Sequence, residues 1–507
     1  MSPIQHFAAG IAEAKVPRAF GVLGSGSSLE LANAIVNGGV AFQGVHHEAS
    51  GAIMAGITGR LSGIPGIAMA IKGPGFSNMA PGLSACLMDG LPMIAAVEAY
   101  PPGTDWAVRH KGSDHGALAQ AVAKGRVQLS ETTSFGNVSA WATGEVPGPV
   151  VVELTDGDGA VPDPLPAVDD VTEVIKAIEA SGQPMIIAGS EALRQGWGRV
   201  LSTLSIPVFS TANAKGVIDE TLAHAAGVYT GVGLGKTPEA LLLAETDLVV
   251  GLGLRPTEVL ATSLPKPSVN IGTLASADAF GFGAASGPGI VGQALSVLAE
   301  KEWGMARTQL VMEKLRVTMM NGGFRPAQIF EAVDRRFDGL VRGVFDVGYF
   351  CTIGEHAWRA RRPDLCLMSG NGRYMGTSIP MGIGAALHDT KVPTVIFVGD
   401  GGIGGPVAEL KIAVQAKLPV MVILLSDGGY GSVRTRAIRD GLTQSPLLMD
   451  QPSWLNAISG LGLPGVRVET MDGFNDALDH WQPESGPVFI EAGFDADAYQ
   501  AMIDGIR

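Results

Sequence analysis

Two acidic, glycine-rich turns carry the residues best suited to chemistry. Gly399-Asp400-Gly401-Gly402 follows the apolar run 394–398, and Ser426-Asp427-Gly428-Gly429 follows the apolar run 420–425. A helical pattern around 408–416 separates the two runs, so the segment predicts a strand–helix–strand unit with parallel strands and a right-handed crossover. Both turns then lie at the carboxyl ends of buried strands, where open α/β sheets bind ligands. Two carboxylates beside glycine-rich backbone indicate a hard metal ion and a phosphate group.

Composition indicates a large globular protein. The 507 residues suggest about three domains. Hydrophobic residues make up 46% of the chain and charged residues 17%, which is enough to build large cores and argues against disorder. The net charge of −14 disfavours nucleic acid and anionic membranes as partners.

Cysteine usage and the N-terminus predict a cytoplasmic protein. Cys86, Cys351 and Cys366 lack metal-ligand spacing and are expected to be free thiols in a reducing compartment. The first 15 residues lack the basic and then apolar pattern of a signal peptide. No apolar run reaches the roughly 18 uncharged residues of a membrane span.

Three segments alternate short apolar runs with helical patterns, which predicts an α/β fold of three consecutive open, mostly parallel sheets. The predicted domains are 1–165, 170–305 and 324–507, with a Pro-, Asp- and Gly-rich linker at 155–169 and a connecting helix at 306–325. The predicted strands are 19–24, 66–71, 92–97, 149–154, 184–188, 207–210, 247–251, 344–348, 365–370, 394–398, 420–425 and 487–491. The first and third segments share a plan of strand, glycine turn and small-residue helix.

The turn Gly24-Ser25-Gly26-Ser27-Ser28 is half of a dinucleotide-binding fingerprint. Leu29 stands where the third glycine of that fingerprint would be, so an ordinary turn between strand and helix is the favoured interpretation.

Five short motifs, taken in order, resemble the thiamine-diphosphate enzymes of the 2-oxo acid decarboxylase and acetolactate synthase group. The Gly-Asp-Gly turn leads through the strand–helix–strand unit to Asp427, which lies 27 residues after Asp400. The other four motifs are His47-Glu48-Ala49, Gly73-Pro74-Gly75-Phe76-Ser77-Asn78, Asp346-Val347-Gly348, and Ser369-Gly370 through Met375-Gly376 to Pro380. Together they cover most of the chain.

The resemblance implies that the chain binds thiamine diphosphate with Mg²⁺, or with Ca²⁺ as the alternative. Asp400, Asp427 and the Gly429 carbonyl would be the metal ligands. Glu48 would hydrogen-bond the aminopyrimidine ring and drive it to the imino form, and Met375 would bend the cofactor so that its rings meet. The other implied cofactor-binding positions are Gly73, Pro74, Asn78, Asp346, Gly348, Gly372, Tyr374, Gly399, Gly401, Gly402, Tyr430 and Gly431.

The implied catalytic and substrate residues come from both ends of the chain. The segment 109–115 looks like the family loop that brings Gln or His to the active site, which makes His110 the candidate proton donor and His115 the alternative. The implied substrate pocket consists of Gly26, Tyr349, Phe350 and Cys351.

Two departures from the family pattern affect the site. Lys72 and Glu98 replace small residues and are expected to pair with each other, with a solvated location as the alternative. Ser426 and Asp427 replace the usual pair of asparagines, and Asp427 adds negative charge near the diphosphate.

The implied reaction is decarboxylation of a 2-oxo acid such as pyruvate, followed by protonation of the enamine or its ligation to an aldehyde or ketone. The alternatives are a 2-hydroxy ketone lyase that uses the same enamine, similar to benzaldehyde lyase, and a catalytically inactive cofactor-binding or regulatory homologue. In this family the glutamate and the Gly-Asp-Gly turn reach one cofactor from different subunits, so a homodimer or homotetramer is implied. The first segment would bind the pyrimidine and the third the diphosphate, with the middle segment as a spacer.

Overall fold

The computed structural model describes residues 2–162, 172–231, 235, 237–260, 264, 266–449, 452–495 and 499. The end of the predicted linker, 163–169, and most of the C-terminal tail lie outside the described residues. The chain forms two compact units. The first unit consists of Met1–Leu165, Gly372–Lys391 and Gly405–Leu418, and the second of Pro166–Asn371, Val392–Gly404 and Pro419–Arg507.

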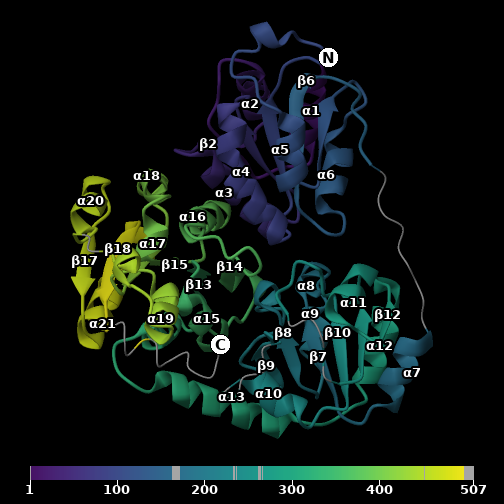
Figure 1. The fold of residues 1–507 in the computed structure, drawn as a ribbon, viewed down its shortest axis with the longest axis vertical. Coiled ribbons are helices and arrows are strands. Elements are labelled where there is room, and N and C mark those ends of the chain that lie inside the picture. The colour runs from purple at the N-terminus through teal and green to yellow at the C-terminus, as the bar shows by residue number, and fades with distance from the viewer. Residues whose placement is uncertain are drawn as a thin grey trace. The chain divides into compact units, whose positions relative to one another are not determined.

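The described residues form three six-stranded sheets in which every strand pair is parallel, which confirms the predicted α/β class (Figure 1). The first sheet belongs to the first unit, and the middle and third sheets belong to the second. The domain boundaries 1–165, 170–305 and 324–507 remain predictions.

The first sheet runs in the order β2-β1-β3-β4-β6-β5. Its strands are β1 (Arg18–Gly21), β2 (Ala41–Gly44), β3 (Gly66–Ala70), β4 (Met93–Glu98), β5 (Gly125–Leu129) and β6 (Pro149–Asp156). The helices of the first unit are α1 (Pro3–Glu13), α2 (Ser27–Asn37), α3 (Glu48–Ser62), α4 (Pro74–Met88), α5 (His115–Val122), α6 (Phe135–Thr143), α16 (Ser378–His388) and α18 (Leu410–Gln415). Helices α1, α2 and α6 share one apolar core with the sheet, while α3 packs against α4 and α16.

The middle sheet runs in the order β12-β11-β10-β7-β8-β9. Its strands are β7 (Pro184–Ala188), β8 (Val208–Ser210), β9 (Ala225–Val228), β10 (Leu248–Leu252), β11 (Ser268–Ile271) and β12 (Ala284–Ser286). Its helices are α7 (Thr172–Ala180), α8 (Ser190–Arg194), α9 (Gly198–Leu201), α10 (Pro238–Leu243), α11 (Leu274–Phe280), α12 (Val291–Leu298) and the predicted connecting helix α13 (Met305–Met320).

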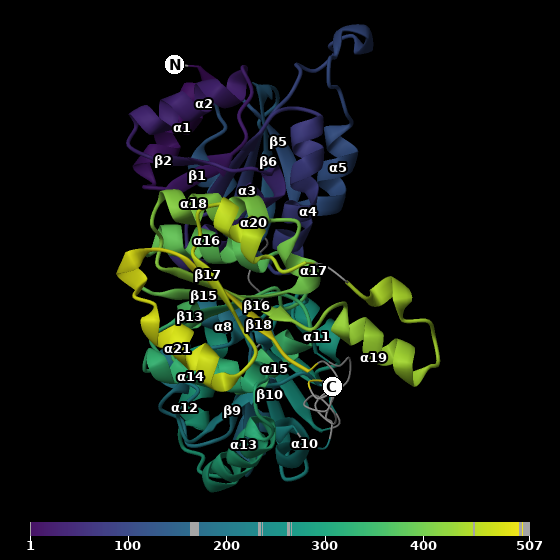
Figure 2. The same ribbon diagram turned by 90° about the vertical axis from the view of Figure 1, so that its left-hand side faces the viewer.

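The third sheet runs in the order β14-β13-β15-β16-β18-β17. Figure 2 labels β13, β15, β16, β17 and β18 among its strands. Its strands are β13 (Arg342–Phe345), β14 (Cys366–Met368), β15 (Thr394–Gly399), β16 (Val420–Ser426), β17 (Gly465–Val468) and β18 (Val488–Gly493). The helices of this part of the second unit are α14 (Pro326–Arg336), α15 (Tyr349–Ala357), α17 (Asp400–Ile403), α19 (Gly431–Arg439), α20 (Leu455–Gly460) and α21 (Met471–His480).

The first and third sheets share one topology, which goes beyond the common plan of strand, glycine turn and helix seen in their sequences. When the strands of each are numbered in chain order, both sheets read 2-1-3-4-6-5. In such sheets the connections leave in opposite directions from the two central strands, so the carboxyl ends of those strands border a ligand-binding crevice. The crevice lies beyond β1 and β3 in the first sheet and beyond β13 and β15 in the third. Gly26, Gly73, Asp346 and Asp400 follow these four strands, whereas Glu48 follows β2 and Asp427 follows β16.

Local sequence signals set the helix ends that matter for the site. Helix α3 begins after His47, whose ring Nδ1 accepts the Ala49 N–H, and ends at Gly63 in a left-handed conformation. Helix α4 begins with Pro74, whose fixed φ suits the first helical position. No described helix has both the length and the hydropathy needed to cross a membrane. The three cysteines are free thiols, as predicted.

Candidate active site

Glu48 is the first residue of α3 and is 7% exposed. The Asn78 side-chain amide donates to its Oε2 at 3.2 Å, so two predicted site residues from different helices meet. Gly75 borders this carboxylate: a Cβ at position 75 would be in van der Waals contact with Glu48 Oε1, at 3.4 Å, and would crowd the Ile71 side chain, at 2.8 Å. Helix α3 approaches the sheet closely through small residues, since a Cβ at Gly59 would lie 2.0 Å from the Pro92 carbonyl oxygen. The position of Glu48 is therefore fixed by packing as well as by hydrogen bonding.

Glu409 also fixes the start of α3, and the sequence motifs did not single it out. This carboxylate is 1% exposed and accepts the backbone N–H groups of His46, at 3.1 Å, and His47, at 3.0 Å. The His46 ring Nδ1 lies 3.2 Å from Glu409 Oε2. Glu409 ends the 3₁₀ turn Val407–Glu409, more than 360 residues later in the chain, so no local pattern could have revealed it.

The turn at Gly73 is held by His115. Gly73 has a φ of +62°, and a Cβ there would lie 1.9 Å from the Lys111 carbonyl oxygen, so only glycine fits. Its N–H donates to His115 Nε2 at 3.2 Å, and His115 Nδ1 lies 3.0 Å from Glu153 Oε1. Nε2 is thus the acceptor and Nδ1–H the donor in this pair of hydrogen bonds. Arg126 and Gln128 also donate hydrogen bonds to the Glu153 carboxylate.

The two candidate histidines differ in environment. His115 is 8% exposed and both of its ring nitrogens have partners, whereas His110 lies exposed on the loop before α5. The geometry gives His115 a role in positioning the Gly73 turn. The assignment of His110 as proton donor remains a prediction.

Replacing His115 by alanine is expected to destabilise the protein by about 1–3 kcal/mol, because the buried Gly73 N–H then lacks an acceptor. Urea unfolding measures this loss. His110→Ala is the matched control from the same loop and should cost about 0.5 kcal/mol or less, since that side chain is exposed. Equal costs for the two variants would contradict this role of His115.

Residues 372–375 belong to the first unit. The Tyr374 hydroxyl donates to Ser84 Oγ at 2.6 Å, and the Gly372 N–H donates to Asp89 at 3.2 Å. Met375 is 50% exposed, so its side chain is accessible from outside the first unit. The roles predicted for these three residues stay predictions.

In the second unit, the two acidic glycine turns contact each other directly. The Asp400 carboxylate accepts the Ser426 hydroxyl at 3.0 Å and the N–H groups of Asp427, at 2.9 Å, and Gly428, at 3.0 Å. The hydroxyl of Ser426 therefore ties one turn to the other. Asp400 begins α17 at the carboxyl end of β15, the strand end where the motif predicted it.

The two carboxylates are crowded together and partly removed from water. Burial raises the pKa of Asp400 above its usual range, against the hydrogen bonds from the second turn. Burial and the neighbouring Asp400 charge raise the pKa of Asp427 to about 7. Gly431 leaves room for Asp427, because a Cβ there would lie 2.3 Å from Asp427 Oδ2. Paired acidic oxygens of this kind suit a divalent cation, which would relieve their mutual repulsion.

Asp346 and Phe350 pack against the same turn. A Cβ at Gly402 would lie 2.4 Å from Asp346 Oδ2, which places that buried carboxylate against the Gly-Asp-Gly turn. Phe350 lies under Gly348 and Gly399 and is 5% exposed. Cys351 is also buried in the core of the third sheet, while the half-buried Tyr349 donates its hydroxyl to the Ser432 carbonyl at 3.3 Å. The role of these side chains in a substrate pocket stays a prediction.

A cavity of about 510 Å³ opens beside the carboxylate pair. Asp400, Ser426, Asp427 and Gly428 are among its lining residues. Arg467 also lines the cavity and is held by Glu491 at 2.6 Å and by Glu469 at 3.1 Å. The pair is therefore accessible to a ligand from within the second unit.

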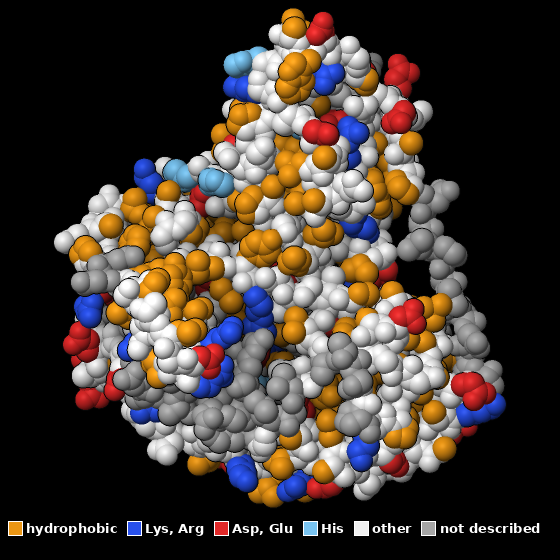
Figure 3. Space-filling view, viewed as in Figure 1, with side chains coloured by type: hydrophobic (Ala, Val, Ile, Leu, Met, Phe, Trp, Pro, Cys, Tyr) orange, Lys and Arg blue, Asp and Glu red, His pale blue; other side chains and the backbone are white. Residues whose placement is uncertain are grey.

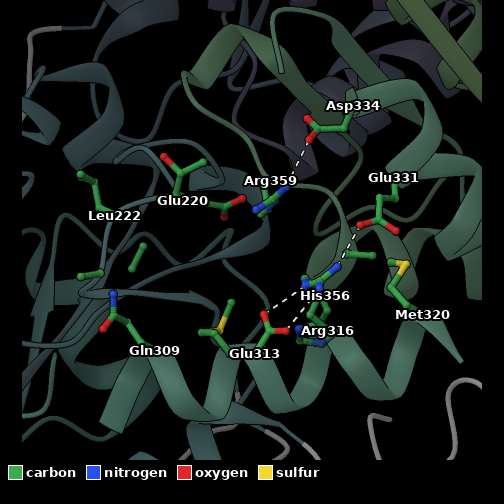
Figure 4. Close-up of a pocket in the computed structure, with 15 residues that line it drawn as sticks. Glu220, Leu222, Gln309, Glu313, Arg316, Met320, Glu331, Asp334, His356 and Arg359 are labelled. Carbon is green, nitrogen blue, oxygen red and sulfur yellow. Dashed lines mark hydrogen bonds and ion pairs between the residues drawn. The ribbon is translucent and has the colours of Figure 1, made fainter. Parts of the chain in front are cut away.

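A second cavity, of about 300 Å³, lies against α13 (Figure 4). Arg316 contacts Glu313 and Glu331 in this cavity, and Arg359 points towards Asp334. None of the predicted site residues is among its lining residues. It is therefore separate from the carboxylate pair.

The described residues contain no group of three His, Cys, Asp or Glu side chains that could hold a metal ion. Asp400 and Asp427 supply two carboxylates, so a cation bound there needs further oxygen ligands from the Gly429 carbonyl and from the bound molecule itself. A diphosphate has such oxygens. The residues present thus fit a metal-bridged diphosphate.

Three family models match the chain in domain order. The N-terminal TPP-binding domain of thiamine pyrophosphate enzymes matches residues 1–108, the central domain 171–279, and the C-terminal TPP-binding domain 346–492. These matches and the two groups of site residues define a thiamine-pyrophosphate enzyme. The chain belongs to this family of thiamine pyrophosphate enzymes.

Curated relatives match over most of their length. Acetolactate synthase of Bacillus subtilis (strain 168) is 27% identical, over 89% of this chain and 85% of its own. A probable 2-ketoarginine decarboxylase of Pseudomonas aeruginosa is 26% identical, over 83% and 81% of the two chains. The catabolic acetolactate synthase of Raoultella terrigena is 24% identical, over 88% and 87%.

Proposed function

We propose that this protein is a thiamine-diphosphate- and Mg²⁺-dependent enzyme that decarboxylates a 2-oxo acid and then protonates the product or ligates it to a second carbonyl compound. The observation that carries the proposal is the buried Glu48, held at the start of α3 by Asn78 and by the Glu409 contacts to the preceding backbone. The Asp400–Asp427 pair supports it. The names of the relatives, acetolactate synthase and 2-ketoarginine decarboxylase, agree with a 2-oxo acid substrate.

Different residues of this chain would bind the diphosphate end and the aminopyrimidine end of the cofactor. Asp400, Asp427 and the Gly429 carbonyl would hold the cation, and the glycine-rich backbone of 399–402 would bind the diphosphate. Glu48 holds a proton at its carboxyl oxygen towards the aminopyrimidine ring, and Asn78 orients that carboxyl group. When bound, the cofactor would supply a nucleophilic carbon for the substrate carbonyl and a group that can stabilise negative charge during decarboxylation.

We propose that two copies of the chain assemble each site, with Glu48 from one copy and the carboxylate pair from the other. Helix α4 carries no charged residue, although Ser77, Asn78, Pro81 and Met88 are exposed on it. The space-filling view shows mostly apolar and uncharged side chains over the part of the first unit that α4 occupies in Figure 1 (Figure 3). An uncharged exposed helix face of this kind is typical of a surface covered by a partner.

Incubation of the protein with thiamine diphosphate, Mg²⁺ and a panel of 2-oxo acids is expected to release carbon dioxide and to form an aldehyde or a carboligation product. Headspace carbon dioxide and product mass spectra measure this, with and without an added acceptor aldehyde. Omission of the cofactor is the control and should abolish the signal. If 2-oxo acids stay intact and a 2-hydroxy ketone is cleaved instead, the lyase reaction replaces this proposal. If neither class reacts at saturating cofactor, the protein is not an enzyme of this kind.

A further inference from the structure

Lys72 and Glu98 form an ion pair at the carboxyl edge of the first sheet, as the sequence predicted. Lys72 lies two residues after β3 and Glu98 is the last residue of β4, the neighbouring strand. Their side chains meet at 3.2 Å between Nζ and Oε2. The Glu98 side chain is 4% exposed and that of Lys72 is 26% exposed, so the pair presents its cationic member to the outside.

Ser28 fixes the Glu98 carboxylate through two hydrogen bonds. Its Oε1 accepts the Ser28 hydroxyl at 2.7 Å and the Ser28 N–H at 3.3 Å. Gly24 and Gly26 make room for it, because a Cβ at either position would lie about 3 Å from Oε1, at 2.9 and 3.0 Å. This explains the two glycines that resembled half of a dinucleotide fingerprint. They accommodate an internal carboxylate, which fits the favoured interpretation of an ordinary turn.

The Glu98 carboxylate remains charged near neutral pH. Burial acts to raise its pKa, but the hydrogen bonds from Ser28 and Lys72 outweigh burial and lower that pKa. A charged, immobile Glu98 keeps the Lys72 ammonium in one place. The Tyr100 ring supports the same group, with Nζ 5.2 Å from the ring centroid.

The Lys72 ammonium keeps unused hydrogen-bonding capacity. An ammonium group has three N–H donors, and among the described residues Glu98 is its one hydrogen-bond acceptor. The partial exposure of Lys72 leaves the remaining donors open to a ligand. A cation with two free donors, fixed by a buried carboxylate and an aromatic face, is a receptor for a carboxylate.

The pair lies on the same sheet edge as Glu48. Ile71 connects the two places, because Cβ atoms at Gly24 and Gly75 would both contact its side chain, at 2.4 and 2.8 Å. Gly24 borders Glu98, and Gly75 borders Glu48. One isoleucine side chain therefore separates the surroundings of the proposed cofactor-activating carboxylate from those of the ion pair.

We propose that Lys72, positioned by Glu98 and Tyr100, binds the carboxylate of the substrate and so makes the site selective for anionic 2-oxo acids. This inference rests on the proposed function and adds the residue that recognises the substrate class. Lys72 supplies two charge-assisted hydrogen bonds to the carboxylate oxygens, while the substrate carbonyl faces the side where Glu48 lies.

The test compares Lys72→Met and Lys72→Arg holoenzymes with the wild type. Lys72→Met is expected to raise the KM for a 2-oxo acid by about 10- to 100-fold, the effect of losing charged hydrogen bonds. The inhibition constant of oxamate, an unreactive carboxylate analogue, should rise by the same factor, whereas that of neutral oxamide should not change. The kcat should change far less than the KM, and Lys72→Arg should recover part of the affinity. Lys15→Met is the control, since Lys15 is exposed just after α1 and is not a predicted site residue.

Two further measurements separate substrate recognition from other roles. Oxamate should protect Lys72, but not Lys15, from trinitrobenzenesulfonate, as read by peptide mass spectrometry. The thiamine diphosphate dissociation constant of Lys72→Met should equal that of the wild type. If this constant rises while oxamate inhibition is unchanged, Lys72 serves a cofactor phosphate and the inference is overturned. A fall in kcat at constant KM overturns it as well.

A double variant controls for folding. Lys72→Met leaves a buried Glu98 without its cation, and Lys72→Met/Glu98→Gln removes both charges. The double variant should regain thermal stability but not oxamate affinity; if it regains affinity, Lys72 has only a structural role. Failure of the proposed function is recognised separately, because the wild type then consumes no 2-oxo acid. The oxamate protection of Lys72 still reports on the anion site in that case.

Discussion

Replacing Glu48 by glutamine is expected to lower the turnover number by about 10²–10⁴-fold, the usual contribution of a general acid–base group. Glutamine keeps the shape of the side chain and can still pair with Asn78, but it cannot hold and release a proton. The fold should remain intact, because Glu409 fixes the start of α3 through the backbone of His46 and His47. Carbon dioxide release measures turnover, and circular dichroism melting measures the fold.

Glu30→Gln is the matched control for this variant. Glu30 is also in the first turn of a helix, α2, but it is exposed, so the same chemical change should leave turnover unaffected. A direct readout of the proton transfer is the deuterium exchange rate at the thiazolium carbon between nitrogen and sulfur, which should slow in Glu48→Gln at full cofactor occupancy. If Glu48→Gln retains wild-type exchange and turnover, Glu48 is not the activating group.

Asp400→Asn is expected to weaken the joint binding of Mg²⁺ and thiamine diphosphate by at least about 100-fold, because a metal ligand matters at least as much as the groups that orient it. Asp400 also accepts three hydrogen bonds from the 426–428 turn, and asparagine can preserve only part of these. The cavity beside the pair should therefore lose one negative charge and some of the hydrogen bonds that join the two turns. Isothermal titration calorimetry with Mg²⁺ at saturating thiamine diphosphate measures the loss. Unchanged affinity would show that the cation binds elsewhere.

Asp427→Asn removes the negative charge at this position but keeps a side-chain oxygen. The amide oxygen can still coordinate the cation, so the loss of affinity should be smaller than for Asp400→Asn. The Asp427 pKa of about 7 lies above the ordinary value of 3.8, so the metal-free native state binds more protons than the unfolded state between these pH values. Its stability should therefore fall as pH rises from about 4 to 7, and Asp427→Asn should flatten that slope in urea unfolding of chelator-treated protein. An equally steep slope in the variant would contradict the assignment.

The central strands could be predicted from the sequence because they are buried on both faces. Strands β3 and β4 are fully buried, and their apolar runs stand out against the turns that bound them. For strand β7, the predicted first and last residues, Pro184 and Ala188, are those of the structure. The glycine turn after β3 placed Gly73 at the correct sheet edge, and the acidic turn after β15 did the same for Asp400.

Of the six edge strands in the described sheets, β14 was predicted and the other five were missed. Strand β2 is only partly buried and β17 exposes three of its four residues, so neither has a continuous apolar run. Strand β9 is buried but consists of Ala225-Ala226-Gly227-Val228, and short runs of small residues do not distinguish a strand from a loop. The six-strand order of each sheet therefore had to come from the structure.

The sequence alone determined the family, the three parallel sheets and the short motifs that carry the chemistry, because each motif is a contiguous run of residues and most of the motifs follow a buried strand. Only the tertiary structure decided which groups act on one another. Glu409 holds the backbone before Glu48 across a separation of 363 residues, and His115 holds Gly73 across 42. Such contacts depend on which strands are neighbours and how their crossovers pack, and neither is encoded in any local pattern. The same holds for Lys72, whose free donors became evident only once Glu98 was found buried beneath it.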